Sequence, residues 1–284
     1  MAVIQIKPGI WPISPAKTGA TDLWRGLAVI SPHWPGIRKR LLLGPTGQPI
    51  NRAPTPSGTA WNGSPFGVAL GNTNSADLRR LLYTGYAPIT TSDGAGSGDF
   101  TMLSLCNPTP AATVAVALHQ RLSGGAANQA SLYPNTDNAG AAEAGAFAFN
   151  TWSTARSAVA ASGVVDGNWH TWIGVRKAGV MSLYRDGVLI ASSSMTVRNI
   201  YSATADFCIG GSPHTATVGL AITDDIGITG AWNRALSDAE IRLLACDPFC
   251  MLRLAERQKI YYIPAAGGAD VRKKIISAYM RIAA

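Results

Sequence analysis

Residues 169–190 read WHTWIGVR, KAG, VMSLYR, DG and VLI. From Trp169 to Ile190, three runs of β-forming residues are separated by two short turn sequences. Asp186-Gly187 is the kind of pair whose positive φ angles a tight hairpin turn prefers, and Gly179 serves the preceding turn in a similar way. The stretch therefore predicts a three-stranded antiparallel meander.

The first strand of this meander has two faces, because successive side chains of a β-strand point to opposite sides of the sheet. We expect the core face to carry Trp169, Thr171, Ile173 and Val175, and the outer face to carry His170, Trp172 and Arg176. On the outer face, Trp172 would need cover from another part of the chain.

Further short runs, bounded by Gly, Asn, Asp and Ser, predict more strands on both sides of the meander. With the meander included, the expected strands are Phe66–Leu70, Asp99–Cys106, Thr113–Gln120, Ala146–Trp152, Trp169–Arg176, Val180–Arg185, Val188–Ser192, Phe207–Gly210 and Ile226–Trp232. So many strands need two sheets or a barrel. The Gly-rich segments Thr90–Gly98 and Ser123–Gly145 are expected to be surface loops, where recognition could take place.

The composition agrees with an all-β protein. Of the 284 residues, 47% are hydrophobic and only 14% are charged, so the chain is not of the polar, highly charged kind that stays disordered. The 30 glycines and 17 prolines leave little room for long helices and suit short strands joined by turns.

The first 60 residues are rich in proline, and we expect them to form an extended N-terminal arm. Prolines from Pro8 to Pro56 break helices and confine strands to sheet edges. Trp11, Trp24 and Trp34 give this arm large apolar groups to bury. Two alternatives stay open: the arm packs on its own domain, or part of it packs on a neighbouring subunit.

Positive charge gathers at both ends of the chain. Residues 1–60 hold seven basic and one acidic side chain, residues 251–284 hold seven and two, and the middle holds ten and thirteen. Basic ends on a mildly acidic body indicate an electrostatic partner. The clusters Arg38-Lys39-Arg40 and Arg272-Lys273-Lys274 are not interleaved with aromatic residues as in nucleic-acid-binding modules, which favours a solvated or partner-facing surface.

One helix is clearly predicted, over residues 237–244. Ser237 and Glu240 form a capping box, and Ile241 and Leu244 then face the body. Near the C-terminus, Tyr279 falls on one helical face together with apolar residues at positions 271, 275 and 282, which predicts a docking element within a basic tail.

Cys106, Cys208, Cys246 and Cys250 form no CxxC pair, and no histidine is spaced to complete a zinc set. We expect these thiols to be buried in a protein kept in a reducing cytoplasm. Lys7 and early prolines stand where a secretory signal needs an apolar run, and no stretch reaches membrane-spanning length. The sequence thus predicts a protein without a signal peptide or membrane contact.

Three motifs follow one another along the chain: Asp99–Leu105 with Asn107-Pro108, Asp166–His170 through Asp186-Gly187, and Thr223–Ile228 leading to Trp232–Ile241. In combination they resemble laminin-G-like members of the concanavalin A-like lectin and glucanase superfamily. The resemblance covers about residues 61–250 and implies an antiparallel jelly-roll sandwich of two sheets. The arm, residues 1–60, and the tail, residues 251–284, lie outside it.

The residues do not favour catalysis. Glycosidases of this superfamily need two carboxylates flanking the scissile bond, on a strand with alternating acidic residues, and Glu143, Glu240 and Glu256 are not paired in this way. Asp224 and Asp225 are the only adjacent acidic pair, and neighbours on a strand point to opposite faces, so we expect no calcium site. We expect no enzymatic activity, metal or cofactor.

A lectin-like body with a proline-rich start and a basic ending looks like proteins encoded among bacteriophage virion genes. The resemblance implies a capsid decoration or cementing protein on the virion surface, which binds the major capsid protein or other virion proteins through its terminal arms. The partner-contact candidates are Trp11, Trp24, Trp34, Arg38, Lys39, Arg40, Arg272, Lys273, Lys274 and Tyr279. A homo-oligomer, such as a trimer at a lattice symmetry point, would follow.

Two other interpretations remain. In the first, the chain is a glycan-binding receptor module of a tail fibre or spike, and loops such as Ser123–Gly145 recognise a host glycan. In the second, it is a cytoplasmic lectin-like domain unrelated to viruses.

Overall fold

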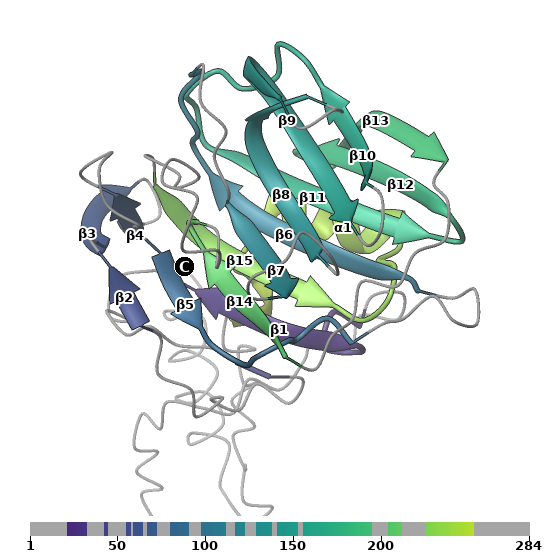
Figure 1. Ribbon diagram of the computed structural model, residues 1–284, viewed down its shortest axis with the longest axis horizontal. Coiled ribbons are helices and arrows are strands. Elements are labelled where there is room, and N and C mark those ends of the chain that lie inside the picture. The colour runs from purple at the N-terminus through teal and green to yellow at the C-terminus, as the bar shows by residue number, and fades with distance from the viewer. Residues whose placement is uncertain are drawn as a thin grey trace, which may run out of the picture. The chain divides into compact units, whose positions relative to one another are not determined.

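Two antiparallel β-sheets stacked on each other form the body of the protein (Figure 1). Its computed structural model describes residues 22–32, 43–44, 55–57, 59–64, 67–72, 80–90, 98–111, 117–122, 129–137, 141–152, 156–194, 204–211 and 225–252. By internal contacts the chain divides into residues 1–253 and residues 254–284, and all described residues belong to the first unit. The predicted all-β sandwich is confirmed.

The first sheet has eight strands within the described residues. Their order is β13-β12-β11-β6-β15-β4-β3, and β1 also pairs with β15. The strands are β1 (Leu27–Pro32), β3 (Thr59–Ser64), β4 (Gly67–Asn72), β6 (Phe100–Cys106), β11 (His170–Lys177), β12 (Val180–Arg185), β13 (Val188–Ser194) and β15 (Ile226–Trp232).

The second sheet has seven strands in the same part of the chain, in the order β10-β9-β8-β7-β14-β5-β2. They are β2 (Thr55–Ser57), β5 (Arg80–Tyr83), β7 (Leu118–Leu122), β8 (Gln129–Thr136), β9 (Ala142–Trp152), β10 (Arg156–Ala161) and β14 (Ala205–Ile209). Helix α1 (Asp238–Cys246) and a short 3-10 turn, η2 (Cys250–Leu252), follow the last strand.

The predicted meander is confirmed as β11, β12 and β13. Its second turn places Asp186 at φ 51° and Gly187 at φ 79°, which is the conformation that an Asp-Gly hairpin turn needs. Ala178 and Gly179 do the same at the first turn, with φ angles of 47° and 78°.

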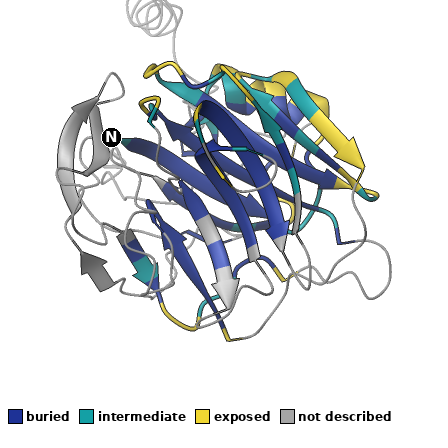
Figure 2. Ribbon diagram, turned by 45° about the horizontal axis from the view of Figure 1, so that its top comes forward, coloured by how far each residue is buried: buried dark blue, intermediate teal, exposed yellow. Residues whose placement is uncertain are grey.

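The assignment of faces on β11 is wrong. Trp172 is fully buried between the two sheets, where its ring stacks on Phe147 of β9 with centroids 3.9 Å apart. Ile173 and Val175 instead lie on the other side of the sheet, in a second apolar cluster. β11 is therefore buried on both of its faces, whereas the edge strand β13 is largely exposed (Figure 2), and alternation along β11 could not show which face meets the second sheet.

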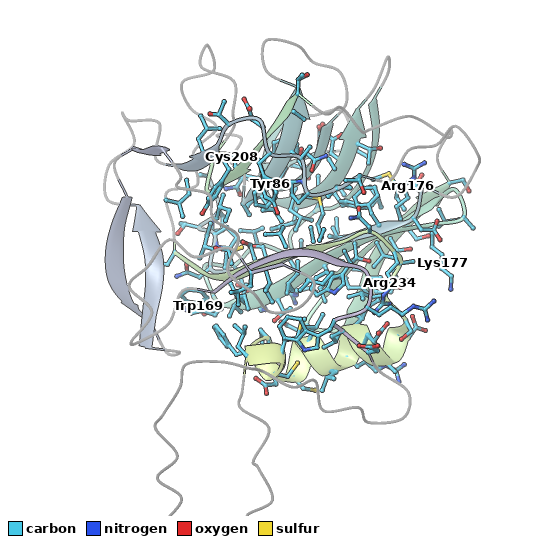
Figure 3. The ribbon with its side chains drawn as sticks, turned by 90° about the horizontal axis from the view of Figure 1, so that it is seen from below. Tyr86, Trp169, Arg176, Lys177, Cys208 and Arg234 are labelled. Carbon is cyan, nitrogen blue, oxygen red and sulfur yellow. The ribbon has the colours of Figure 1, made fainter. Side chains whose placement is uncertain are left out.

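Helix α1 covers the second apolar cluster (Figure 3). The predicted capping box is present: Ser237 Oγ accepts from the amide of Glu240, and the Glu240 carboxylate accepts from the amide of Ser237. Ile241 and Leu244 are buried against the sheet, as predicted.

The predicted arm is part of the sandwich where it is described. β1 pairs with β15, and β2 and β3 add to the two sheets. Trp24 is buried in the second apolar cluster, and the neighbouring Leu23 carbonyl accepts a 2.7 Å hydrogen bond from Trp232 Nε1. Leu23 and Trp24 therefore pack on their own chain, against the side of the eight-stranded sheet that faces away from the seven-stranded sheet.

The segment expected to be a surface loop, Ser123–Gly145, contains a central strand. β8 pairs with β7 on one side and with β9 on the other. Pro134 is accommodated because the register shifts there and Asn135 adopts φ 56°. The Asn135 side chain donates to Thr109 O at 2.9 Å and accepts from Gly145 N at 3.1 Å, so the irregularity is fixed by hydrogen bonds.

The expectation of four buried thiols holds only in part. Cys106 and Cys208 are buried, Cys250 is half-buried and Cys246 is exposed at the end of α1. Among the described residues, no helix is long and apolar enough to cross a bilayer.

Candidate ligand-binding face

The seven-stranded sheet has one face whose side chains do not belong to the inter-sheet core. Ala130 and Leu132 of β8 and Phe147 and Phe149 of β9 point into that core. The residues that alternate with them on these and neighbouring strands point the other way. We call this side the outer face, and its described members are Ser131, Tyr133, Ala148, Asn150, Asp206 and Cys208.

One register row crosses the outer face. Asn150 is opposite Ser131, Ser131 is opposite His119, and His119 is opposite Cys208. Residues directly opposite one another on antiparallel strands share a face and have neighbouring Cβ atoms. The row therefore brings polar residues of four consecutive strands together. In Figure 3, Cys208 lies on the side of the body away from α1.

Two polar atoms in this row are without hydrogen-bond partners. Ser131 Oγ and Asn150 Oδ1 are both buried and unbonded in the part of the chain that the structure describes. A buried polar group in this state costs free energy, which a bound partner would recover. Since both side chains are buried, a ligand reaches them only when the groups that cover them move aside.

The next register row is also rich in residues suited to polar ligands. Trp152 is opposite Gln129 on β8 and opposite Arg156 on β10. Arg121 is opposite Asp206 of β14, and the Asp206 carboxylate accepts a 2.7 Å hydrogen bond from Gly85 N.

The segment that follows β5 closes one end of the sandwich. The Gln120 amide accepts from Ile89 N and donates to Ile89 O, both at 2.7 Å. Asn233, beyond β15, accepts from Thr90 N at 2.8 Å and donates to Pro88 O at 3.0 Å. These bonds fix residues 88–90 to both sheets. Tyr86, which belongs to the segment after β5 (Figure 3), packs edge-on against Phe207 of β14.

A second polar group lies where the meander begins. The two ring nitrogens of His170 face two carboxylates: Nδ1 meets Asp186, and Nε2 lies 3.0 Å from Asp166 Oδ1. The other oxygen of Asp186 accepts from Thr171 N at 2.9 Å. The pKa of Asp166 is lowered, chiefly because its carboxylate accepts from the amide of Asn168; burial opposes this shift, and the hydrogen bond to His170 adds to it. Both carboxylates therefore bond within the protein, and through His170 they join the turn at Asp166 to the turn at Asp186.

Asp224 and Asp225 are the acidic pair that the sequence analysis weighed for calcium. Within the described ranges, no three His, Cys, Asp or Glu side chains come together to hold a metal ion. Asn107 N donates to Asp225 O at 3.3 Å, and the Asn107 side-chain oxygen accepts from Asp225 N at 2.9 Å. Asp224 lies outside the described residues.

Of the ten partner-contact candidates, only Trp24 falls on described residues, and it is buried within its own chain. The others lie outside the described residues: Trp11, Trp34, Arg38, Lys39, Arg40, Arg272, Lys273, Lys274 and Tyr279.

A family model described as concanavalin A-like lectin/glucanases superfamily matches residues 83–242. The chain belongs to this superfamily. The match begins at the end of β5 and ends within α1, so it includes both the meander and the outer face.

Solved structures of two binding domains resemble this chain in fold. The binding domain of Paraclostridial mosquitocidal protein 1 aligns with a TM-score of 0.57 and 13% identity, over 80% of this chain and 53% of that one. The binding domain of botulinum neurotoxin DC, solved with rat synaptotagmin II, aligns with a TM-score of 0.52 and 10% identity, over 79% and 52%. The chain thus spans about half the length of these structures. No curated protein gives a significant match.

Sequence reasoning missed the outer face. Ser131 lies in a segment interpreted as a loop, and Asn150 lies in a predicted strand whose pairing partners were unknown. The available signal was alternation: Ala130 and Leu132 on one side, Ser131 and Tyr133 on the other.

Proposed function

We propose that this lectin-like sandwich is a non-enzymatic binding module whose outer face binds a glycan. The observation that carries the proposal is the row from Asn150 through Ser131 to Cys208, with its two buried, unpartnered oxygen atoms. Glycans are dense in hydroxyl groups, which can donate to Asn150 Oδ1 and can donate to or accept from Ser131 Oγ.

Two further points support a binding role. The solved structures of similar fold quoted above are binding domains of larger proteins. The carboxylates that the structure describes near one another, Asp166 and Asp186, are engaged by His170 and by backbone amides. A non-enzymatic function is part of the proposal.

The test is a glycan array probed with the purified chain, followed by calorimetry with the best ligand. Ser131→Ala and Asn150→Ala should each weaken binding by about tenfold or more, since each removes one favourable contact of about 1.4 kcal/mol. Ser193→Ala is the matched control, because Ser193 is exposed on β13 of the other sheet. A flat array, or equal loss in the control, contradicts the proposal.

A second function, bacteriophage capsid decoration, is favoured by the distribution of charge. The segments 1–60 and 251–284 carry most of the positive charge of a chain whose net charge is +8. In this proposal they attach the sandwich to the major capsid protein or another virion protein, and repetition over the lattice provides avidity. A homo-oligomer on the virion surface would present several outer faces at once.

The test of this second function is particle association. Deletion of residues 254–284, which form a separate unit, should abolish association and leave the sandwich folded. Deletion at the other end should stop at residue 21, because β1 belongs to the sheet. Copy number from mass spectrometry of purified particles separates a decoration protein, at a simple lattice fraction, from a tail protein at a few copies. Absence from particles contradicts both locations.

A further inference from the structure

Trp172, Ser104 and Thr229 lie in one register row inside the sandwich, on the inner face of the eight-stranded sheet, and Ser31 of β1 ends the row opposite Thr229. Trp172 of β11 is opposite Ser104 of β6, and Ser104 is opposite Thr229 of β15. All three are buried, with exposed fractions of 0%, 0% and 1%. The next row toward β1 is apolar, with Met102 and Ala231 in the inter-sheet core.

None of the three has a hydrogen-bond partner for its polar atom. Trp172 Nε1, Ser104 Oγ and Thr229 Oγ1 are unbonded in the described part of the chain. Nearby Thr101 shows the usual state of a buried hydroxyl: its Oγ1 donates to Arg234 O at 2.9 Å and accepts from Leu236 N at 3.0 Å. Three orphaned groups side by side are therefore exceptional.

We propose that this row binds an internal water molecule. A buried water typically makes about three hydrogen bonds to groups that the protein leaves unpaired, which is the number offered here. The indole N–H can only donate, and the two hydroxyls can donate or accept, so one water can satisfy all three. Cβ atoms of opposite residues lie roughly 4.5–5.5 Å apart, and Ser104 stands between Trp172 and Thr229, so the water is placed beside Ser104, between its two neighbours.

The surroundings favour water over a larger ligand. Phe147 stacks on Trp172 from the second sheet, and Met102 and Ala231 line the adjacent row. Both sheets are close-packed apolar layers here, so the row has no room for more than a small polar molecule.

The direction in which one substitution changes the melting temperature tests this inference. Thr229→Val replaces the hydroxyl with a methyl group of similar size. If the hydroxyl holds water, the variant loses that bond, and its melting temperature falls by about 2–4 °C. If the hydroxyl is simply unpaired, the methyl group removes a penalty and the melting temperature rises. Thr229→Ser keeps the hydroxyl and should retain the water.

A direct readout is the number of long-lived internal waters, from oxygen-17 magnetic relaxation dispersion of the full chain. Thr229→Val should have one fewer than the wild type, and Thr229→Ser the same number. Ser104→Ala gives an independent variant with the same expected loss. An unchanged count in Thr229→Val and Ser104→Ala, or a raised melting temperature in Thr229→Val, overturns the inference.

Discussion

Arg234 donates two parallel hydrogen bonds to the carboxylate of Glu240, from Nη2 to Oε1 at 2.6 Å and from Nη1 to Oε2 at 2.8 Å. The same guanidinium donates to the carbonyls of Asp22 at 2.8 Å and Arg25 at 2.6 Å. One side chain thereby joins the start of α1 to the chain that leads into β1. Such bidentate pairs are geometrically specific, which explains why Arg234 can fix both elements at once.

Glu240→Gln should reduce the free energy of unfolding by about 1.5–3 kcal/mol, because hydrogen bonds to the charged carboxylate are lost. Burial alone would raise the pKa of Glu240, but Arg234 and Ser237 outweigh it and lower that pKa to about 2. The stabilisation is therefore present above the unfolded pKa of about 4.3 and is lost as the pH falls toward 2.

Urea denaturation at pH 6, 4 and 3 checks this expectation. The wild type should lose more stability than Glu240→Gln between pH 4.5 and pH 3, since the glutamine does not titrate. Parallel pH profiles would contradict it. Asp238→Asn, an exposed change in the first turn of the same helix, is the control.

Gly174→Ala should destabilise the sandwich strongly. A Cβ atom on Gly174 would lie 2.5 Å from ring carbons of Phe149, on the facing sheet. Overpacking of this kind costs about 1–3 kcal/mol or more. Adding Phe149→Leu should recover part of the loss in melting temperature, because it makes room. Simple additivity of the two changes would show that the contact is not the cause.

Asp186→Ala should cost about 1–3 kcal/mol, because Thr171 N loses its acceptor and alanine tolerates φ 51° poorly. Asp186→Asn keeps an oxygen acceptor and suits the left-handed conformation, so its cost should be smaller. Equal losses in the two variants, measured by urea denaturation, would mean that the turn does not depend on these bonds.

Thiol labelling should distinguish the cysteines. Cys246 is exposed, and Cys106 and Cys208 are fully buried. A maleimide should therefore modify Cys246 in the native protein and reach Cys106 and Cys208 only after unfolding. Native labelling of Cys208 would indicate that the outer face opens, and mass spectrometry of labelled peptides gives the site.

The fold could be predicted where local chemistry decides the structure. The Asp186-Gly187 turn and the capping box from Ser237 to Glu240 have the predicted conformations. β12 and β15 also have their predicted limits. In each case a few neighbouring residues determine the backbone, so no tertiary information is needed.

The rest depends on contacts between distant residues. β8 contains Pro134 and small polar residues, and it is a strand because β7 and β9 pair with it on both sides. β11 is apolar on both faces, so only the position of Phe147 shows that Trp172 points inward. The outer face has the same origin: Ser131 and Asn150 become neighbours through register alone.

The place of β15 has a consequence for synthesis on the ribosome. β15 is the last strand of the described chain, yet it pairs with β1, β4 and β6, all translated earlier. Until residue 232 has left the exit tunnel, those strands lack the neighbour that joins them, and the edge of β6 stays open to other nascent chains. Completion of the eight-stranded sheet is therefore expected to come late, after all its other strands have been synthesised, and a pause in translation after β14 would prolong the aggregation-prone state.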